Sequence, residues 1–318
     1  MKISAVQSVF TVFLLAATFY STLFAEELQR FEYKKIQMGV PVRLVFYGES
    51  QTEQQKARAD AAAEKVFSRI ETLKMVFSDY ESESELRKAC VEAQSGKEVR
   101  VSEDFWIVLK ASEKYYRLSQ GAFDPTVAGA VKLWRRAMRE GRFPRKDKLE
   151  EARRLTNFAL VELNEQNRSM RFAEKGMRLD FGGIAKGYII DESLKILCQE
   201  GFPRAMVDIG GDLALGDAPP PESGKPEGWK IGLMDASGEK VKEFKYLSRC
   251  AVATSGATNR YVEIDGVRYS HIINPKTGIG LTHSSVTTVI APTAMEADAW
   301  ASARSVNPQL PEFVNQEK

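Results

Sequence analysis

The feature that most constrains the fold is the uneven distribution of helical and strand patterns along the chain. Residues 52–76 carry apolar side chains at three- and four-residue steps, and Ser102 precedes a second helical segment that ends at Gly121. The second half holds short segments rich in β-branched residues, two of them joined by the hairpin signal Asp265-Gly266. Because helices dominate first and strands later, the sequence predicts an α+β fold rather than a regularly alternating parallel sheet.

The remaining elements follow from the same patterns. A third helix is predicted from near Ala185 to Gly201. The Pro/Gly-rich residues 216–228 lack periodicity, which predicts a flexible surface loop. The predicted strands are 205–209, 230–234, 251–254, 261–264, 267–273 and 285–291. No internal repeat is present, so residues 26–318 are expected to form one domain.

The composition limits the classes of partner. The chain has 318 residues, of which 43% are hydrophobic, enough to bury a core. Its 45 Lys and Arg nearly balance 43 Asp and Glu, which argues against nucleic acid as a partner. Cys90, Cys198 and Cys250 are odd in number and widely spaced. They are interpreted as partly buried thiols rather than a disulfide framework or a metal site.

Residues 1–25 are typical of a secretory signal. Lys2 precedes an apolar run from Val9 to Tyr20, and Ala25 suits the last position before cleavage. Leu23 is large where a small residue is preferred, so an uncleaved membrane anchor is the alternative. Either way the protein is expected to be exported, to the periplasm or to the outer face of the inner membrane.

The stretch LDFGGIAKGYIID, residues 179–191, has the character of a phosphate-binding loop. Gly182 and Gly183 let the backbone approach a ligand, and the helix that begins near Ala185 directs its free N–H groups there. Lys186 adds positive charge, and Asp180 could accept hydrogen bonds from a base or ribose. The stretch matches neither the Walker A loop nor the dinucleotide fingerprint. A tight strand-to-helix turn with a solvated lysine is therefore the alternative.

Two further stretches carry candidate chemistry. Asp298 and Ser302 are four residues apart and share a helix face, and their oxygens suit Mg²⁺. The alternative for Asp298 is an acid favoured by the helix dipole. His271 precedes an Asn-Pro turn and titrates near neutral pH, so it could take a proton from a hydroxyl. A structural histidine is the alternative there, and it is the preferred interpretation of His283.

Together these stretches resemble the ApbE family of FAD:protein FMN transferases. The similarity spans roughly residues 32–304, and the motifs occur in the family's order. The matching segments are GAFDPT (121–126), LDFGGIAKGYIID (179–191), VDIGGD (207–212), TSGATNRY (254–261), HIINPKTG (271–278) and EADAWASA (296–303), with QMGVPV (37–42) and FSDYESESEL (77–86) upstream.

The resemblance implies an ApbE-like α+β fold of mixed or antiparallel sheets with packed helices. It also implies a Mg²⁺-dependent enzyme that cleaves FAD, releases AMP and joins FMN to a threonine or serine hydroxyl of an acceptor protein. It assigns His271 as the base that deprotonates this hydroxyl, and Gly183, Asp298 and Ser302 as metal ligands. The FAD-contacting positions that it implies are Met38, Tyr80, Ala122, Phe123, Asp124, Asp180, Lys186 and Ile272.

Several alternatives stay open. The same residues would serve an FAD pyrophosphatase that gives FMN and AMP, and a relative could bind FAD without cleaving it. The acceptor is expected to be a membrane or secreted redox protein with a Ser/Thr-Gly-Ala-Thr segment, and the chain a monomer or homodimer. Two departures from the family are Asn274, where aspartate is frequent, and the early end at Lys318. A missing edge element there is expected to weaken the fold or the metal site.

Overall fold

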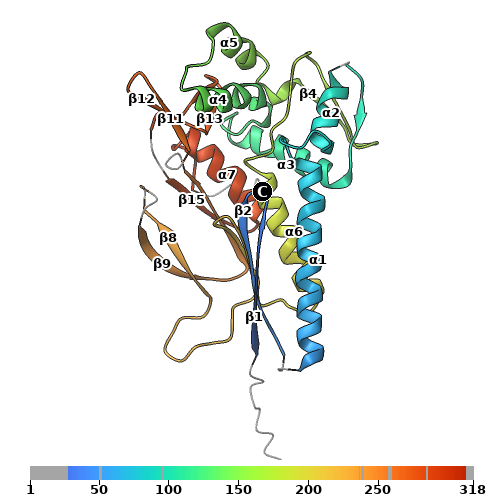
Figure 1. The fold of residues 1–318 in the computed structure, drawn as a ribbon, viewed down its shortest axis with the longest axis vertical. Helices are drawn as coiled ribbons and strands as arrows, with labels where there is room; N and C mark the ends of the chain where they lie inside the picture. The colour runs from blue at the N-terminus through green and yellow to red at the C-terminus, as the bar shows by residue number, and fades with distance from the viewer. Residues whose placement is uncertain are drawn as a thin grey trace, which may run out of the picture.

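The computed structural model describes residues 28–49, 52–94, 96–235, 237, 240–256, 260–283 and 286–312. These residues form the α+β fold that the sequence predicts, with helices packed on antiparallel sheets (Figure 1). The predicted signal segment, residues 1–25, lies outside the described residues. Among the described helices, none combines the length and the apolar character needed to cross a bilayer.

A six-stranded sheet occupies the centre of the molecule. Its spatial order is β1-β2-β6-β7-β10-β15, and every neighbouring pair is antiparallel. Segments far apart in the chain therefore end side by side, which brings distant motifs together. The strands are β1 (Gln29–Gln37), β2 (Val40–Gly48), β6 (Ala205–Ile209), β7 (Asp212–Leu215), β10 (Cys250–Gly256) and β15 (Val286–Ala291).

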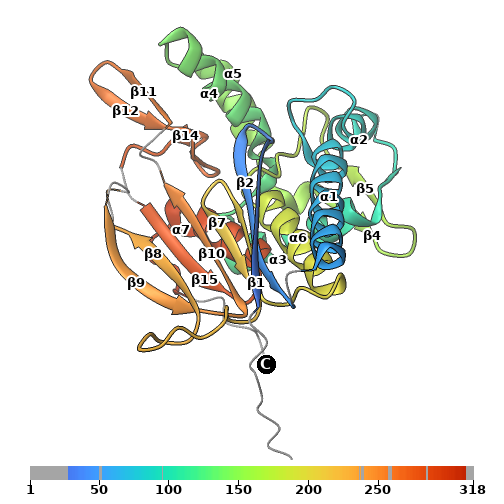
Figure 2. The ribbon, with the colours of Figure 1, turned by 60° about the horizontal axis from the view of Figure 1, so that its bottom comes forward.

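The two faces of this sheet are covered by different elements. Helices α1, α6 and α7 pack on one face, where Leu44 and Phe46 of β2 join the main core (Figures 1 and 2). Val45 points to the opposite face and packs with Trp229 and Ile231 of a β8–β9 hairpin. Successive side chains of β2 therefore point to opposite faces of the sheet, and both faces are buried. These elements are α1 (Glu53–Phe77), α6 (Ala185–Gln199), α7 (Ala294–Val306), β8 (Trp229–Met234) and β9 (Val241–Leu247).

The other elements surround this centre. A three-stranded sheet of order β3-β5-β4 lies near α2, and α4 and α5 pack together (Figure 1). They are α2 (Glu85–Ala93), β3 (Val99–Arg100), α3 (Glu103–Leu118), η1 (Pro125–Val127), α4 (Ala128–Glu140), α5 (Lys146–Arg154), η2 (Phe158–Leu160), β4 (Val161–Asn164), β5 (Ser169–Phe172), β11 (Tyr261–Ile264), β12 (Val267–Ser270), β13 (Ile273–Asn274) and β14 (Ile279–Gly280).

Side-chain caps confirm the predicted starts of the first two helices, whereas α6 begins at Ala185 as predicted but without such a cap. Thr52 Oγ1 accepts a hydrogen bond from the Gln55 amide at 3.1 Å, one residue before α1 begins. Ser102 Oγ accepts from the Phe105 amide at 3.3 Å and caps α3. Each hydroxyl satisfies one of the free N–H groups that open a helix.

One predicted strand is too long. The turn Asp265-Gly266 joins β11 to β12 as expected, with positive φ values of 52° and 75°. Strand β12, however, ends at Ser270 rather than at residue 273. The His271 amide still donates to the carbonyl of Arg260 at 2.9 Å, one position beyond the Tyr261–Ser270 pair, but the next residue, Ile272, bonds to Leu281 instead. His271 consequently lies in a connection between two short hairpins.

Residues 216–228 contain neither helix nor strand, as the composition predicts. The start of this loop is held in place, because Arg204 and the Trp229 indole donate to the carbonyls of Ala218 and Asp217. The three cysteines are free thiols, also as predicted.

Gly187 marks the closest approach of α6 to α7. A Cβ atom at this position would lie 2.2 Å from the carbonyl oxygen of Ala294 and 2.6 Å from the Cα of Met295. Both are backbone atoms, which cannot turn away as a side chain can. The two helices can therefore meet here only because residue 187 has no side chain.

Gly187→Ala is expected to lower the free energy of unfolding by about 3 kcal/mol, since overpacking against fixed backbone forces the helices apart. Urea denaturation measures this change. Gly129→Ala in α4 is the control, because its added Cβ would meet Ala152 Cβ at an ordinary 3.4 Å. Equal effects of the two substitutions would contradict the packing argument.

Candidate active site

Two carboxylates fasten the starts of α6 and α7 to each other. The Gly187 amide in the first turn of α6 donates to Asp298 Oδ2 at 3.1 Å. In return, Asp191 of α6 accepts hydrogen bonds from the amides of Ala294 and Met295, at 2.7 and 2.8 Å, in the first turn of α7. Both carboxylates face a helix N-terminus, where negative charge is favoured. We call these three hydrogen bonds the carboxylate clasp.

The clasp brings together the three predicted metal ligands. A Cβ on Gly183 would lie 2.7 Å from Ser302 Oγ, so the Gly-rich loop contacts that hydroxyl directly. Asp298 lies one turn before Ser302 on α7 and is 6% exposed. Burial raises the pKa of Asp298, nearby Lys186 opposes this, and Asp212 adds to it. A cation would relieve the cost of this buried carboxylate.

The candidate metal site has few anionic ligands. In the part of the chain that the structure describes, no group of three or more His, Cys, Asp or Glu side chains could hold a metal ion. A cation beside Asp298 would therefore also need neutral oxygens, such as the Ser302 hydroxyl and a loop carbonyl. Neutral oxygen ligands and water are common for Mg²⁺, so the residues present fit this ion.

Lys186 lies close to these carboxylates. Its Nζ is 2.6 Å from Asp212 Oδ2, while Asp212 Oδ1 accepts from the Thr254 amide at 2.9 Å. Burial alone would lower the pKa of Lys186, but Asp298 and Asp212 outweigh it and raise the pKa. The lysine therefore keeps its positive charge beside the Gly-rich loop. Asp208, by contrast, accepts from Gly211 in its own turn.

The loop Ala122-Phe123-Asp124 is part of the same region. Phe123 lies beside Gly183, since a Cβ on that glycine would be 3.5 Å from its ring. Asp124 is used to hold its own loop: one carboxylate oxygen accepts from the Thr126 amide and hydroxyl, and the other accepts from the Phe158 amide. Burial raises the pKa of Asp124 to about 6. Ala122 is buried beside them.

Tyr80 and Asp180 meet at an arginine that the sequence analysis did not select. Arg135 of α4 forms ion pairs with Asp79 and, at 3.0 Å, with Asp180. Its guanidinium carbon lies 4.6 Å from the centroid of the Tyr80 ring. Asp180 also accepts from the Gly182 amide at 2.8 Å. Two predicted FAD-contacting positions from distant segments thus share one cation.

His271 is held in a defined tautomer. Its Nδ1 lies 3.1 Å from the carbonyl oxygen of Arg260. A carbonyl can only accept, so Nδ1 carries the proton and Nε2 of the neutral ring has a free lone pair. The residue is exposed, yet the atoms around the ring disfavour the charged form and lower the pKa of His271 below 6.5. The imidazole is neutral at pH 7 and can act as a base.

Two other predicted FAD-contacting positions lie at turns. Met38 forms the β1–β2 turn with Gly39, has a positive φ of 52°, and packs against the main core. Ile272 follows His271, and its carbonyl accepts from the Leu281 amide at 2.9 Å. These contacts hold Met38 and Ile272 in their own surroundings and do not join them to Asp298 or Lys186. The second histidine, His283, contacts the Ser305 carbonyl and is structural, as interpreted from the sequence.

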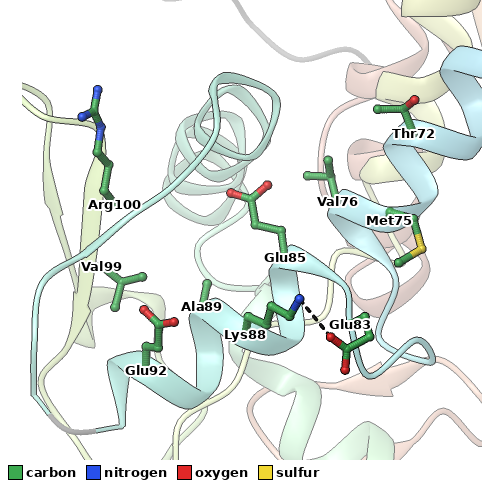
Figure 3. Close-up of a pocket in the computed structure, with 10 residues that line it drawn as sticks. All are labelled: Thr72, Met75, Val76, Glu83, Glu85, Lys88, Ala89, Glu92, Val99 and Arg100. Atoms are coloured by element: carbon green, nitrogen blue, oxygen red, sulfur yellow. Dashed lines mark ion pairs between the residues drawn. The ribbon is translucent and has the colours of Figure 1, made fainter.

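A separate hollow of about 420 Å³ lies between α1, α2 and β3, and Figure 3 shows the residues that line it. Met75, Lys88 and Arg100 are among the residues that line it, and an ion pair joins Lys88 to Glu83. None of the predicted site residues takes part in its lining. The candidate active site is therefore defined by its converging polar groups rather than by this hollow.

Asp191→Ala is expected to lower the free energy of unfolding by about 2 kcal/mol, because two amides at the start of α7 lose their acceptor. Burial raises the pKa of Asp191 from 3.8 to about 6. A raised folded-state pKa contributes stability that is complete below pH 3.8 and lost as the pH rises through 6. The stability difference between wild type and variant should therefore shrink from pH 4 to pH 7.

Urea denaturation at four pH values between 4 and 7 measures this difference. Asp147→Ala is the control, because this exposed carboxylate is paired with Arg145, which lowers its pKa below 3.8. The pKa of its folded-state carboxyl lies below the window, so its stability difference should change only slightly and should rise rather than shrink with pH. If the stability difference between wild type and Asp191→Ala did not change with pH, burial would not have raised the pKa of Asp191.

The fold and the site define a class of protein: α+β proteins in which a Gly-rich loop before a helix meets a buried carboxylate of a second helix and a lysine. The chain belongs to the ApbE family, whose family model matches residues 38–318. The FAD:protein FMN transferase of Treponema pallidum is 35% identical over 262 residues, covering 78% of this chain and 71% of that protein. The Escherichia coli protein of the same name is 28% identical over 251 residues, covering 76% and 70%.

Solved structures show the same fold. The ApbE protein of Thermotoga maritima superposes with a TM-score of 0.74 and 31% sequence identity, covering 87% of each chain. The flavin transferase ApbE of Vibrio cholerae superposes with a TM-score of 0.73 at 24% identity, covering 88% of this chain and 87% of that one. The antiparallel architecture predicted from the resemblance is thereby confirmed.

Proposed function

We propose that this chain is an exported, Mg²⁺-dependent FAD:protein FMN transferase. Relatives that match over three quarters of the chain carry this activity in their names. The observation that carries the proposal is the tautomer of His271, whose Nδ1 is held by the Arg260 carbonyl. A neutral histidine with a free Nε2 suits proton transfer from an acceptor hydroxyl.

The proposed reaction forms one bond to phosphorus, breaks another, and gives the released proton to a side chain of this protein. The acceptor hydroxyl oxygen forms a bond to the phosphorus of the FMN half of FAD. The bond between that phosphorus and the bridging pyrophosphate oxygen breaks, and AMP leaves with the electron pair. The hydroxyl proton passes to Nε2 of His271. Little covalent chemistry is required of the protein, so positioning and charge stabilisation make up most of the catalysis.

The pyrophosphate needs positive charge and N–H donors. Lys186 supplies a half-buried cation, and the dipole of α6 places partial positive charge beside the Gly-rich loop. In our proposal Asp298, Ser302 and the Gly183 carbonyl would hold the metal ion. Bound Mg²⁺ would neutralise charge on the phosphate oxygens. The clasp keeps the Gly-rich loop and the metal-binding helix together while substrate enters.

The acceptor in this proposal is a membrane or secreted redox protein with a Ser/Thr-Gly-Ala-Thr segment. The family resemblance supports that choice, and the signal-like residues 1–25 support an exported location. The FAD contacts assigned to Met38, Tyr80, Ala122, Phe123, Asp124, Asp180, Lys186 and Ile272 belong to the same proposal.

The test mixes the purified chain with FAD, Mg²⁺ and a test protein that carries a Ser-Gly-Ala-Thr segment, and intact mass is then measured. A test protein heavier by one FMN, only when Mg²⁺ is present, is the expected result. Free FMN and AMP with unmodified protein would overturn the transferase in favour of a pyrophosphatase. Intact FAD would overturn both and leave an FAD-binding protein.

A further inference from the structure

Arg135 connects three segments that surround the candidate active site. It lies on α4, which is separated from the loop that contains Phe123 and Asp124 only by the short helix η1. Its guanidinium pairs with Asp180 of the Gly-rich loop at 3.0 Å and with Asp79 of the α1–α2 connection. The Asp180 amide in turn donates to the Pro125 carbonyl at 2.8 Å. One side chain thus joins loops that are distant in the sequence.

The Tyr80 ring is stacked on one face only. Arg135 lies over the ring with its guanidinium carbon 4.6 Å from the centroid. Tyr80 nevertheless remains 75% exposed, the largest exposed fraction among the large hydrophobic side chains of the described residues. An aromatic ring with one face against a cation and the other open to solvent is prepared to stack on a planar ligand.

The backbone that carries Tyr80 is also fixed. Ser78 Oγ accepts hydrogen bonds from the amides of Tyr80 and Glu81, at 3.2 and 3.1 Å. Arg87 donates to the Asp79 carbonyl at 3.1 Å. The exposure of Tyr80 therefore does not come from a loosely held loop. The ring is presented on an ordered turn, and Arg135 limits how it can rotate.

We propose that Arg135 is a positioning residue for FAD: its guanidinium orients Tyr80 to stack on a ring of the dinucleotide and neutralises Asp79 and Asp180 beside the pyrophosphate. The proposal rests on the proposed function in its choice of ligand. Arg135 acts through Tyr80 and the two carboxylates rather than on the reacting atoms. Its loss should weaken FAD binding and leave the chemical step nearly unchanged.

A lysine at position 135 could not make all the contacts of Arg135. A guanidinium can bind two carboxylates and stack on a ring at once, because it is planar and carries five donors. An ammonium group keeps the charge but is a compact point charge without a flat face. Arg135→Lys should consequently fall between wild type and Arg135→Met. This graded result separates the geometry of the side chain from its charge.

The experiment measures FAD affinity by quenching of flavin fluorescence, without acceptor protein, and then kcat and KM for FMN transfer. Arg135→Met is expected to raise the Kd for FAD about tenfold, by the loss of one cation–π contact and the repulsion from two released carboxylates. We expect kcat at saturating FAD to stay within about twofold of wild type, since the ground state and the transition state lose the same binding energy.

Coupling to Tyr80 tests the mechanism. Tyr80→Phe keeps the ring and should lose less FAD affinity than Tyr80→Ala, which removes it. In the double variant Arg135→Met/Tyr80→Ala, the Kd for FAD should rise by less than the product of the two single-variant increases. The reason is that the two residues act as a unit. The matched control is Arg136→Met, which removes the neighbouring exposed arginine paired with Glu140.

The outcomes are distinct. Wild-type FAD affinity in Arg135→Met, an equal loss in Arg136→Met, or fully independent effects of Arg135 and Tyr80 would each overturn the proposal. If Arg135→Met fails to fold, Arg135→Lys and Tyr80→Ala still provide the test. A wild-type chain that binds FAD without transferring FMN would overturn the proposed function alone, because the affinity measurements do not depend on turnover.

Discussion

Asp298→Asn is expected to lower kcat for FMN transfer roughly a thousandfold, corresponding to about 4 kcal/mol of lost transition-state stabilisation. The buried carboxylate is the one anionic group among the three proposed metal ligands. Asparagine has nearly the same shape, and its side-chain oxygen can still accept from the Gly187 amide. The fold and the clasp should therefore survive while affinity for the cation falls.

The measurement is the rate of FMN transfer by intact mass, over a titration of Mg²⁺. A variant rescued in part by high Mg²⁺ would support a ligand role. Asp265→Asn is the control, because this carboxylate lies in the exposed β11–β12 turn, where asparagine tolerates the positive φ of 52°. Near-normal transfer by Asp298→Asn at low Mg²⁺ would contradict the proposed metal site.

His271→Ala is expected to lower kcat by a factor of about 10² to 10⁴, the usual contribution of a positioned general base. The wild-type rate should also depend on pH with a defined sign. A base must be unprotonated to act, and the pKa of His271 lies below 6.5. We therefore expect kcat to rise with pH through an apparent pKa below 6.5 and to be constant around neutrality.

His283→Gln is the matched control for this prediction. His283 is the second of two histidines in the chain, and its Nε2 lies 3.1 Å from the Ser305 carbonyl. Glutamine can still donate to that carbonyl, so the rate and its pH profile should be retained. An acidic limb that persists unchanged in His271→Ala would show that another group is the base.

How far the sequence predicts the fold depends on how much of an element's stability is local. Strand β6 was predicted as residues 205–209, as observed, because its residues other than Asp208 are apolar. Strand β1 was not predicted: its sequence QRFEYKKIQ is largely polar and partly exposed, and it is a strand because it pairs with β2 along its whole length. Such an edge strand carries little signal of its own.

The candidate site divides in the same way. Asp298 and Ser302 could be paired from the sequence because helical spacing places them on one face. Asp191 and Arg135 could not, since their partners come from tertiary packing: Asp191 lies 103 positions from Ala294, and Arg135 lies 45 positions from Asp180. A reader of the sequence sees in them only a helix acid and a helix base.

The carboxylate clasp has a consequence for how the molecule opens. The amides of Gly187 in α6 and Ala294 in α7 each donate a hydrogen bond to a carboxylate of the other helix. Neither helix start can fray without releasing its neighbour, so the two should exchange their amide hydrogens as one cooperative unit. A ligand that binds the Gly-rich loop would then slow exchange at the start of α7 as well, and the protection of Ala294 would report on occupancy of a loop that lies more than a hundred residues earlier in the chain.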